Sequence, residues 1–311
     1  MSLYKKIGFG VTAAAIVGAA IYGGYKVSQH YGYFQKKQTI KQKIGFIGSG
    51  MMAEAIARGI LEKELVKPDQ VMGSDPIPER REVFKKYGFH ATENNEEVVE
   101  FADIIILATK PQVAEEMLKH LKNKNLAEEK IVVTIMAGKQ IGWVKEHLGE
   151  KSKIVRVMPN TPLAIGEGAA GIVSKGCSKE EVDLVVSIFK SVAVVEVFED
   201  ESKIDIVTGL SGSGPAYIFR LIEAMVEGGV QGGLNENDAL ELAIQTVIGA
   251  GKLAAKRRAE NISIPKLREM VTSPHGTTEA GLNFLDKNHF YETVSGAVVK
   301  ATERSIELGK N

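Results

Sequence analysis

Short apolar runs alternate with amphipathic helical patterns between residues 42 and 202. The runs predict five buried strands, at residues 43–48, 70–75, 103–109, 130–136 and 153–158. Strands that alternate with helices are typical of βαβ units, in which the strands lie parallel. The pattern therefore predicts an α/β fold with a doubly wound parallel sheet over residues 42–202.

Residues 203–311 contain helical patterns alone. These predict helices at residues 215–232, 236–258, 264–272 and 277–308, with a break near Asn288. A helical region of this size buries little apolar surface by itself. The helix over 236–258 has small residues on one face, among them Ala243 and Ala250, which permits close packing against another chain. We expect an all-α C-terminal dimerisation domain.

The first 41 residues form a separate segment. Residues 7–25 carry no charge and would span about 28 Å as a helix, close to the thickness of a bilayer. We interpret them as a retained membrane anchor followed by a polar linker, with the folded part in the cytoplasm or in an organelle such as the mitochondrion. A cleaved targeting segment and an apolar surface helix are the alternatives, and either leaves a cytoplasmic or organellar protein without an anchor.

The composition is that of an ordinary globular protein, with 44% hydrophobic and 25% charged residues in 311. The net charge of zero hides an asymmetry, because residues 1–53 hold seven lysines and no carboxylate. The rest carries 32 basic against 39 acidic residues, which argues against nucleic-acid binding and favours a small-molecule ligand. Cys177 is the single cysteine and the histidines show no ligand spacing, so we predict no metal.

The first predicted strand is followed at once by the sequence Gly48-Ser49-Gly50-Met51-Met52-Ala53, which opens a helix. This is a G-x-G-x-x-A fingerprint between a strand and a helix, the setting that dinucleotide binding requires. The first glycine permits a tight turn, the second lets the backbone approach a pyrophosphate, and the alanine lets the helix pack closely on the strand. We predict that residues 48–52 bind a dinucleotide in a Rossmann domain.

Charged residues after the second predicted strand bear on the choice of cofactor. Asp75 can accept hydrogen bonds from an adenosine ribose and repels a 2′-phosphate, which favours NADH. Arg80 and Arg81 can reach a phosphate, which favours NADPH, or can lie in solvent as first-turn residues. Both cofactors therefore stay open. Thr109, Lys110 and Pro111 come at the carboxyl end of the third predicted strand, where ligands of such sheets bind.

Two stretches of the helical half combine glycine, proline and hydroxyl residues at a helix start. Residues 208–217 place Ser211 and Ser213 before Pro215, a favourable first helical residue. Residues 271–281 contain a proline that ends one helix, Gly276 for a turn, and Thr277 or Thr278 to cap the next helix. Free amides at such a start suit a carboxylate. Taken singly, each stretch is also explained as an ordinary helix cap.

These two stretches and the fingerprint, together with Thr109-Lys-Pro-Gln112 and Arg156-Val-Met-Pro-Asn-Thr-Pro162, closely resemble pyrroline-5-carboxylate reductase from about residue 42 to residue 309. The resemblance implies reduction of 1-pyrroline-5-carboxylate to L-proline by hydride transfer from NADPH or NADH, the last step of proline biosynthesis. It also implies a homodimer, often assembled into a decamer, in which the turn at 273–278 faces the partner subunit's nicotinamide.

The resemblance assigns roles to individual residues. Asn160 is carried over as a cofactor contact, and Thr278 as the contact to the substrate's ring nitrogen. The helix start around Ser273, Gly276 and Thr277 is expected to hold the substrate carboxylate, and Ser211 and Ser213 to shape the opposite wall of the pocket.

Two residues depart from the family's usual pattern. Met51 stands where asparagine or lysine is frequent, and His275 stands where glycine is usual. His275 would narrow the pocket or require a positive φ of a non-glycine residue. Two alternatives stay open: another imine or β-hydroxyacid reductase on the same plan, and a membrane-anchored dinucleotide-binding protein without activity.

Overall fold

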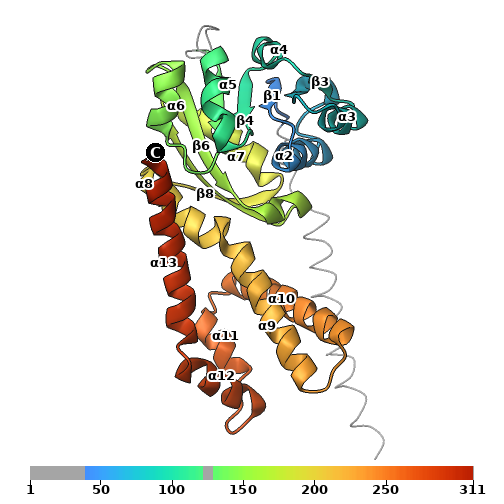
Figure 1. Cartoon of the computed structure of the whole chain (residues 1–311), viewed down its shortest axis with the longest axis vertical. Helices are drawn as coiled ribbons and strands as arrows, with labels where there is room; N and C mark the ends of the chain where they lie inside the picture. The colour runs from blue at the N-terminus through green and yellow to red at the C-terminus, as the bar shows by residue number, and fades with distance from the viewer. Residues whose placement is uncertain (1–38, 122–128, 311) are drawn as a thin grey trace, which may run out of the picture. The chain divides into compact units, whose positions relative to one another are not determined.

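The computed structural model describes residues 39–121 and 129–310. Within these ranges a sheet of eight strands has the order β3-β2-β1-β4-β5-β6-β7-β8 (Figure 1). The strands are β1 Ile44–Ile47, β2 Val71–Ser74, β3 His90–Thr92, β4 Ile104–Leu107, β5 Ile131–Thr134, β6 Lys153–Pro159, β7 Gly168–Lys175 and β8 Ala193–Val197. The predicted anchor at residues 7–25 lies outside the described residues, and no helix inside them has both the length and the apolar character needed to cross a membrane.

The centre of the sheet is parallel and fully buried. Ile44 of β1 lies opposite Val71 of β2 on one side and Ile104 of β4 on the other. Every residue of β1, β4 and β5 is buried, as expected for parallel strands whose two faces are both covered. The helices of this half are α2 Met51–Glu62, α3 Pro78–Lys86, α4 Asn95–Phe101, α5 Ala114–Leu121, α6 Ile141–Leu148 and α7 Lys179–Lys190.

The predicted fold class is confirmed: the five predicted strands, β1, β2, β4, β5 and β6, pair in parallel, and the sheet adds one antiparallel pairing. β7 runs antiparallel to β6, and β8 is parallel to β7. The sequence prediction missed β3, β7 and β8. β3 has three residues and none is buried, β7 opens with small residues, and β8 has an apolar run but is mostly exposed.

The second half is helical, as predicted. It contains α8 Ser202–Val207, a π-helical turn Thr208–Gly212, α9 Gly214–Gln231, α10 Glu236–Arg258, α11 Ile264–Met270, α12 Thr277–Lys287 and α13 Phe290–Gly309. The expected break is confirmed, because Asn288 ends α12 and His289 takes a left-handed φ of +58° before α13. Figure 1 shows α9 beside α10, and α13 running from α12 back to the sheet.

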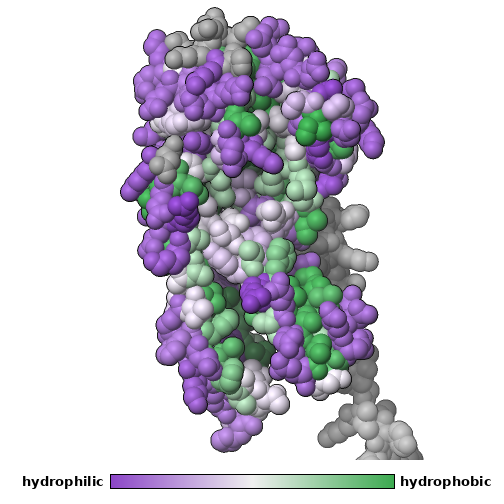
Figure 2. Space-filling model, in the orientation of Figure 1, coloured by the Kyte–Doolittle hydropathy of each residue, from purple (hydrophilic) through white to green (hydrophobic). Residues whose placement is uncertain are grey.

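The helical half exposes much apolar surface. No residue of α9, α11 or α12 is buried in the described chain. Figure 2 shows apolar surface over this half of the molecule. The exposed apolar residues of α9, α10, α12 and α13 include Ile218, Phe219, Val230, Leu240, Leu242, Ile244, Ile248, Leu253, Phe284, Leu285, Phe290, Tyr291, Val294 and Val299.

Candidate active site

The glycine loop between β1 and α2 has the geometry of a pyrophosphate site. Gly48 has a φ of +92°, and a Cβ there would lie 2.9 Å from the backbone of Ala108. Gly50 is the N-cap of α2, has no side-chain cap, and faces open space where a Cβ would point. Ala53, in the first turn of α2, is fully buried. Free first-turn amides and a helix dipole aimed at open space suit an anion, so these residues fit a dinucleotide.

Asp75 supports the glycine loop from the end of β2. It is almost buried, its Oδ2 accepts a hydrogen bond from the Ser49 N–H at 2.9 Å, and its Oδ1 accepts one from the Ile77 N–H at 3.0 Å. Each carboxylate oxygen keeps further acceptor capacity. The structure thus gives Asp75 a part in shaping the loop, and its contact with a ribose stays a prediction.

The two arginines near the loop are engaged within the protein. Arg80 donates from Nε to the Ser49 carbonyl at 2.8 Å and from Nη2 to Glu54 Oε2 at 2.9 Å. Arg81 donates from Nη1 to the carbonyls of Asp75 and Pro76. Neither guanidinium is a freely solvated surface group, and both brace the segment around the loop. Arg80 is next to the expected cofactor, while its contact with a phosphate stays a prediction.

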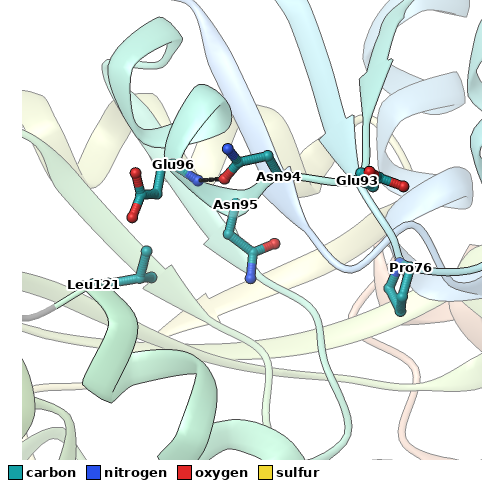
Figure 3. Close-up of a pocket in the computed structure, with 6 residues that line it drawn as sticks. All are labelled: Pro76, Glu93, Asn94, Asn95, Glu96 and Leu121. Atoms are coloured by element: carbon teal, nitrogen blue, oxygen red, sulfur yellow. Dashed lines mark hydrogen bonds between the residues drawn. The ribbon is translucent and has the colours of Figure 1, made fainter.

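A cavity of about 570 Å³ lies beside Asp75 and was not predicted from the sequence (Figure 3). It is lined by Pro76, Glu93, Asn94, Asn95, Glu96 and Leu121. Asn95 Oδ1 accepts a hydrogen bond from the Ser74 hydroxyl at 2.6 Å, which fixes the orientation of the amide. The cavity's place past the end of β2 is where this fold class receives an adenosine. In the sequence, the Asn94-Asn95 pair at the start of α4 could have indicated this cavity. The pair places the cavity only when the preceding strand β3 is known, and β3 was not predicted.

The loops that follow β4 and β5 form a second hollow. Thr109 donates a hydrogen bond to Met136 Sδ at 3.6 Å, and Lys110 is the N-cap of a short 3₁₀ turn that starts at Pro111. A cavity of about 430 Å³ is lined by Pro111, Gln112, Ala137, Gly138, Lys139 and Leu308. Leu308 comes from α13, so the end of the chain reaches the carboxyl edge of the sheet.

Asn160 joins the sheet to the π-helical turn. Its Nδ2 donates to the Ser211 carbonyl at 3.1 Å, and its Oδ1 accepts from the Ala169 N–H at 2.8 Å. Ser211 donates its hydroxyl to the Val207 carbonyl, and Ser213 makes no side-chain cap, so neither serine is a side-chain helix cap. The structure therefore brings Asn160, Ser211 and Ser213 together at the carboxyl end of β6.

The turn at 273–278 differs from the prediction in its details. Gly276, and neither Thr277 nor Thr278, is the N-cap of α12, and no side chain caps the helix. The left-handed residue is His275, with a φ of +59°, whereas Gly276 is extended. Gly276 packs closely on Ser273, since a Cβ at position 276 would lie 3.0 Å from the Ser273 carbonyl oxygen. The predicted capping threonines were wrong because a glycine can end the turn and begin the helix at once.

This turn lies far from the glycine loop within one chain. Figure 1 shows α12 at one end of α13 and the sheet at the other, and the 20 residues of α13 span about 30 Å. The predicted substrate residues Ser273, Gly276, Thr277 and Thr278 are thus not brought to the predicted cofactor residues of the same protomer.

Comparison with known proteins decides the family. Residues 201–308 match the family described as pyrroline-5-carboxylate reductase dimerisation, and residues 43–138 match NADP oxidoreductase, coenzyme F420-dependent. The chain is 42% identical to the pyrroline-5-carboxylate reductase of Arabidopsis thaliana over 272 residues, which cover 86% of this chain and 96% of the relative. It is 41% identical to that of Methanosarcina acetivorans over 271 residues, covering 86% and 98%. The chain belongs to the pyrroline-5-carboxylate reductase family.

Solved structures of the reductase family share the fold. The pyrroline-5-carboxylate reductase of Coxiella burnetii superposes with a TM-score of 0.82 at 34% identity, covering 88% of this chain and all of that one. The Plasmodium falciparum enzyme, solved with NADP bound, gives 0.77 at 33% identity, covering 87% and 99%. The dimerisation match covers the helices whose apolar faces are exposed in a single chain, and it supports a homo-oligomer.

Cys177 lies outside this site in the reductase fold. It is about half-buried, and its Sγ is near the carbonyls of Ile154 and Lys175. Burial, reinforced by the charge of Glu181, raises the pKa of the thiol to about 11. A thiol with so high a pKa is a poor nucleophile at neutral pH.

Proposed function

We propose that this chain reduces 1-pyrroline-5-carboxylate to L-proline with NADPH or NADH, the last step of proline biosynthesis. One structural observation carries the proposal beyond the family match. Gly50 and Gly276 are both extended N-caps without a side-chain cap, one in the cofactor half and one in the helical half. The fold thus presents two uncapped helix starts, which suit a pyrophosphate and a carboxylate.

The residues of the chain bind and orient the reactants. The nicotinamide supplies the hydride that adds to the carbon of the C=N bond, while the nitrogen takes up a proton. The amides at the start of α12 hold the substrate carboxylate, and the Thr278 hydroxyl bonds the ring nitrogen. Ser211 and Ser213 form the opposite wall next to Asn160. Holding the imine in one orientation and excluding water are the protein's contribution to rate.

Residues 48–52 hold the pyrophosphate, Thr109 to Pro111 and Asn160 lie along the nicotinamide end, and Asp75 with Arg80 faces the adenosine end. We place NADPH first, because the related Plasmodium falciparum structure holds NADP. NADH remains the second cofactor, because Asp75 offers a carboxylate to a ribose.

The complete site needs two chains in this proposal. Within one protomer α13 separates the 273–278 turn from the glycine loop. A partner subunit that packs on the exposed helices supplies the missing half. Assembly of such dimers into a decamer is the larger state that we propose. Residues 7–25 are proposed to anchor the assembly to a membrane, with the catalytic part in the cytoplasm or an organelle.

One assay tests the activity. Purified full-length protein in mild detergent and a shortened chain that begins at Gln42 are each given pyrroline-5-carboxylate, and oxidation of NADPH or NADH is followed. We expect turnover by both proteins and L-proline as the product. A folded dimer that oxidises neither cofactor would remove the proposed reaction and leave a dinucleotide-binding protein.

A further inference from the structure

A buried cluster of charged side chains joins the sheet to the helical half. Arg156 of β6 has a side chain only 3% exposed. Its Nη1 donates to Glu201 Oε1 at 2.9 Å, and its Nη2 lies 3.7 Å from Asp205 Oδ1. Glu201 precedes α8 and Asp205 lies within it. Neither the cofactor nor the substrate assignment uses these residues.

Two other elements also donate hydrogen bonds to the carboxylates of the cluster. The Ser305 hydroxyl of α13 donates to Asp205 Oδ1 at 2.7 Å, and the Ile141 N–H at the start of α6 donates to Glu201 Oε1 at 2.8 Å. Two carboxylates share one guanidinium, and the surplus negative charge is offset by these donors and by the N-terminus of α6. A buried charge of this kind persists only with such partners. The cluster therefore fixes β6, α6, α8 and α13 to one another.

Both chain segments that leave the cluster lead directly to the proposed site. β6 continues from Arg156 to Asn160, and α8 continues into the π-helical turn with Ser211. A second contact connects the two segments, because Asn160 Nδ2 donates a hydrogen bond to the Ser211 carbonyl. The turn also lies directly against α13, since a Cβ on Gly209 would be 2.3 Å from Thr302 Oγ1. The turn is thus held from three sides.

We propose that Arg156 is a positioning residue of the reductase reaction. Its ion pairs lock the spacing between the carboxyl end of β6, which borders the nicotinamide, and the π-helical turn, which borders the imine. The inference rests on the proposed function. Without the lock, the pocket wall shifts relative to the cofactor, and the hydride-transfer step slows while the dinucleotide loop stays intact.

Two variants and a matched control test this role in the full-length protein. Arg156→Lys keeps the charge but loses the forked geometry that reaches both carboxylates. Ser305→Ala is a milder change that removes one hydroxyl from Asp205. The control is Lys153→Ala on the same strand, whose ion pair with Glu181 Oε1 at 2.7 Å is partly exposed and lies away from the turn.

We expect Arg156→Lys to lower kcat about tenfold or more and to raise the isotope effect seen with NADPH deuterated at the transferred position. Ser305→Ala should also lower kcat and raise the isotope effect, but by smaller factors. Lys153→Ala should leave kcat and the isotope effect at their wild-type values. The dissociation constant for NADPH stays at the wild-type value in all three. Hydrogen exchange at the Ser213 amide, which bonds the Thr208 carbonyl at 2.8 Å, becomes faster in the two cluster variants.

Arg156→Lys and Ser305→Ala proteins that melt at lower temperature yet keep the wild-type kcat, isotope effect and Ser213 exchange would reduce the cluster to a stabilising contact and overturn the proposal. If the wild-type protein does not reduce the imine, the proposed function fails separately. The exchange rate at Ser213 then decides alone: faster exchange in the variants supports the lock, and unchanged exchange overturns it.

Discussion

In the 273–278 turn, the residue with the left-handed backbone is His275, and the neighbouring glycine, Gly276, is extended. The pattern indicated that glycine would supply the turn, whereas His275 adopts the left-handed conformation and its N–H is held by Glu279 Oε2 at 2.8 Å. Gly276 packs closely on Ser273. The positive φ at His275 was one of the two alternatives that its departure from glycine predicted, and the structure shows it.

The Thr278 hydroxyl is the sharpest residue-scale test of the substrate site. Thr278 is the second residue of α12 and is exposed in one chain, where its hydroxyl contacts no described residue by a hydrogen bond. Thr278→Val should remove one hydrogen bond to a charged substrate, worth roughly 1.5 to 3 kcal/mol. We expect kcat/KM for the imine to fall about ten- to a hundredfold, with unchanged NADPH affinity.

Thr272→Val serves as the control, because the Thr272 hydroxyl donates to the Arg268 carbonyl within the same region. Steady-state kinetics and cofactor titration of both variants separate the effects. Normal kcat/KM in Thr278→Val, or a loss confined to cofactor binding, would take Thr278 out of the substrate site.

At the scale of secondary-structure elements, the sequence predicted those strands and helices whose apolar residues recur with a regular local spacing. The buried strands and the long helices were found because each has a continuous apolar run or stripe. β7 and β8 were missed because β7 opens with small residues and β8 is mostly exposed. The Arg156 cluster was missed because its carboxylates, Glu201 just before α8 and Asp205 within α8, lie more than forty residues away in the sequence.

The glycine loop gives an element-scale prediction about cofactor choice. Asp75→Ala removes a negative charge that repels a 2′-phosphate and an acceptor for a ribose. We expect the ratio of kcat/KM for NADPH to that for NADH to rise about tenfold, equivalent to ~1.4 kcal/mol. Both cofactors should also bind more weakly, because the Ser49 and Ile77 amides lose their acceptor.

Asp75→Asn separates these two effects, since it removes the charge and keeps an oxygen for one loop amide. It should shift the ratio in the same direction with a smaller loss of affinity. An unchanged cofactor ratio in both variants would show that Asp75 only supports the loop.

On the scale of the whole molecule, the segment at residues 7–25 predicts where the protein is found. A retained anchor should keep full-length protein in the membrane pellet through high-salt and carbonate washes, because an uncharged helix of 19 residues is stable in the bilayer. The chain that begins at Gln42 should be recovered in the supernatant with equal activity. Immunoblots of the fractions measure this, and intact full-length protein in the wash would rule out the anchor.

The absence of buried residues in α9, α11 and α12 of the described chain also has a thermodynamic consequence. From α9 to α12 the described protomer buries only Ala239 and Ala243 of α10, so coupled folding and association should govern the stability of the helical half. Its unfolding then depends on protein concentration through mass action. Each tenfold increase in concentration raises the apparent free energy of unfolding of the dimer by about 1.4 kcal/mol and raises its Tm. Calorimetry across a concentration series should show a Tm that rises for the helical half, whereas a constant Tm would mean that a single chain completes its fold unaided.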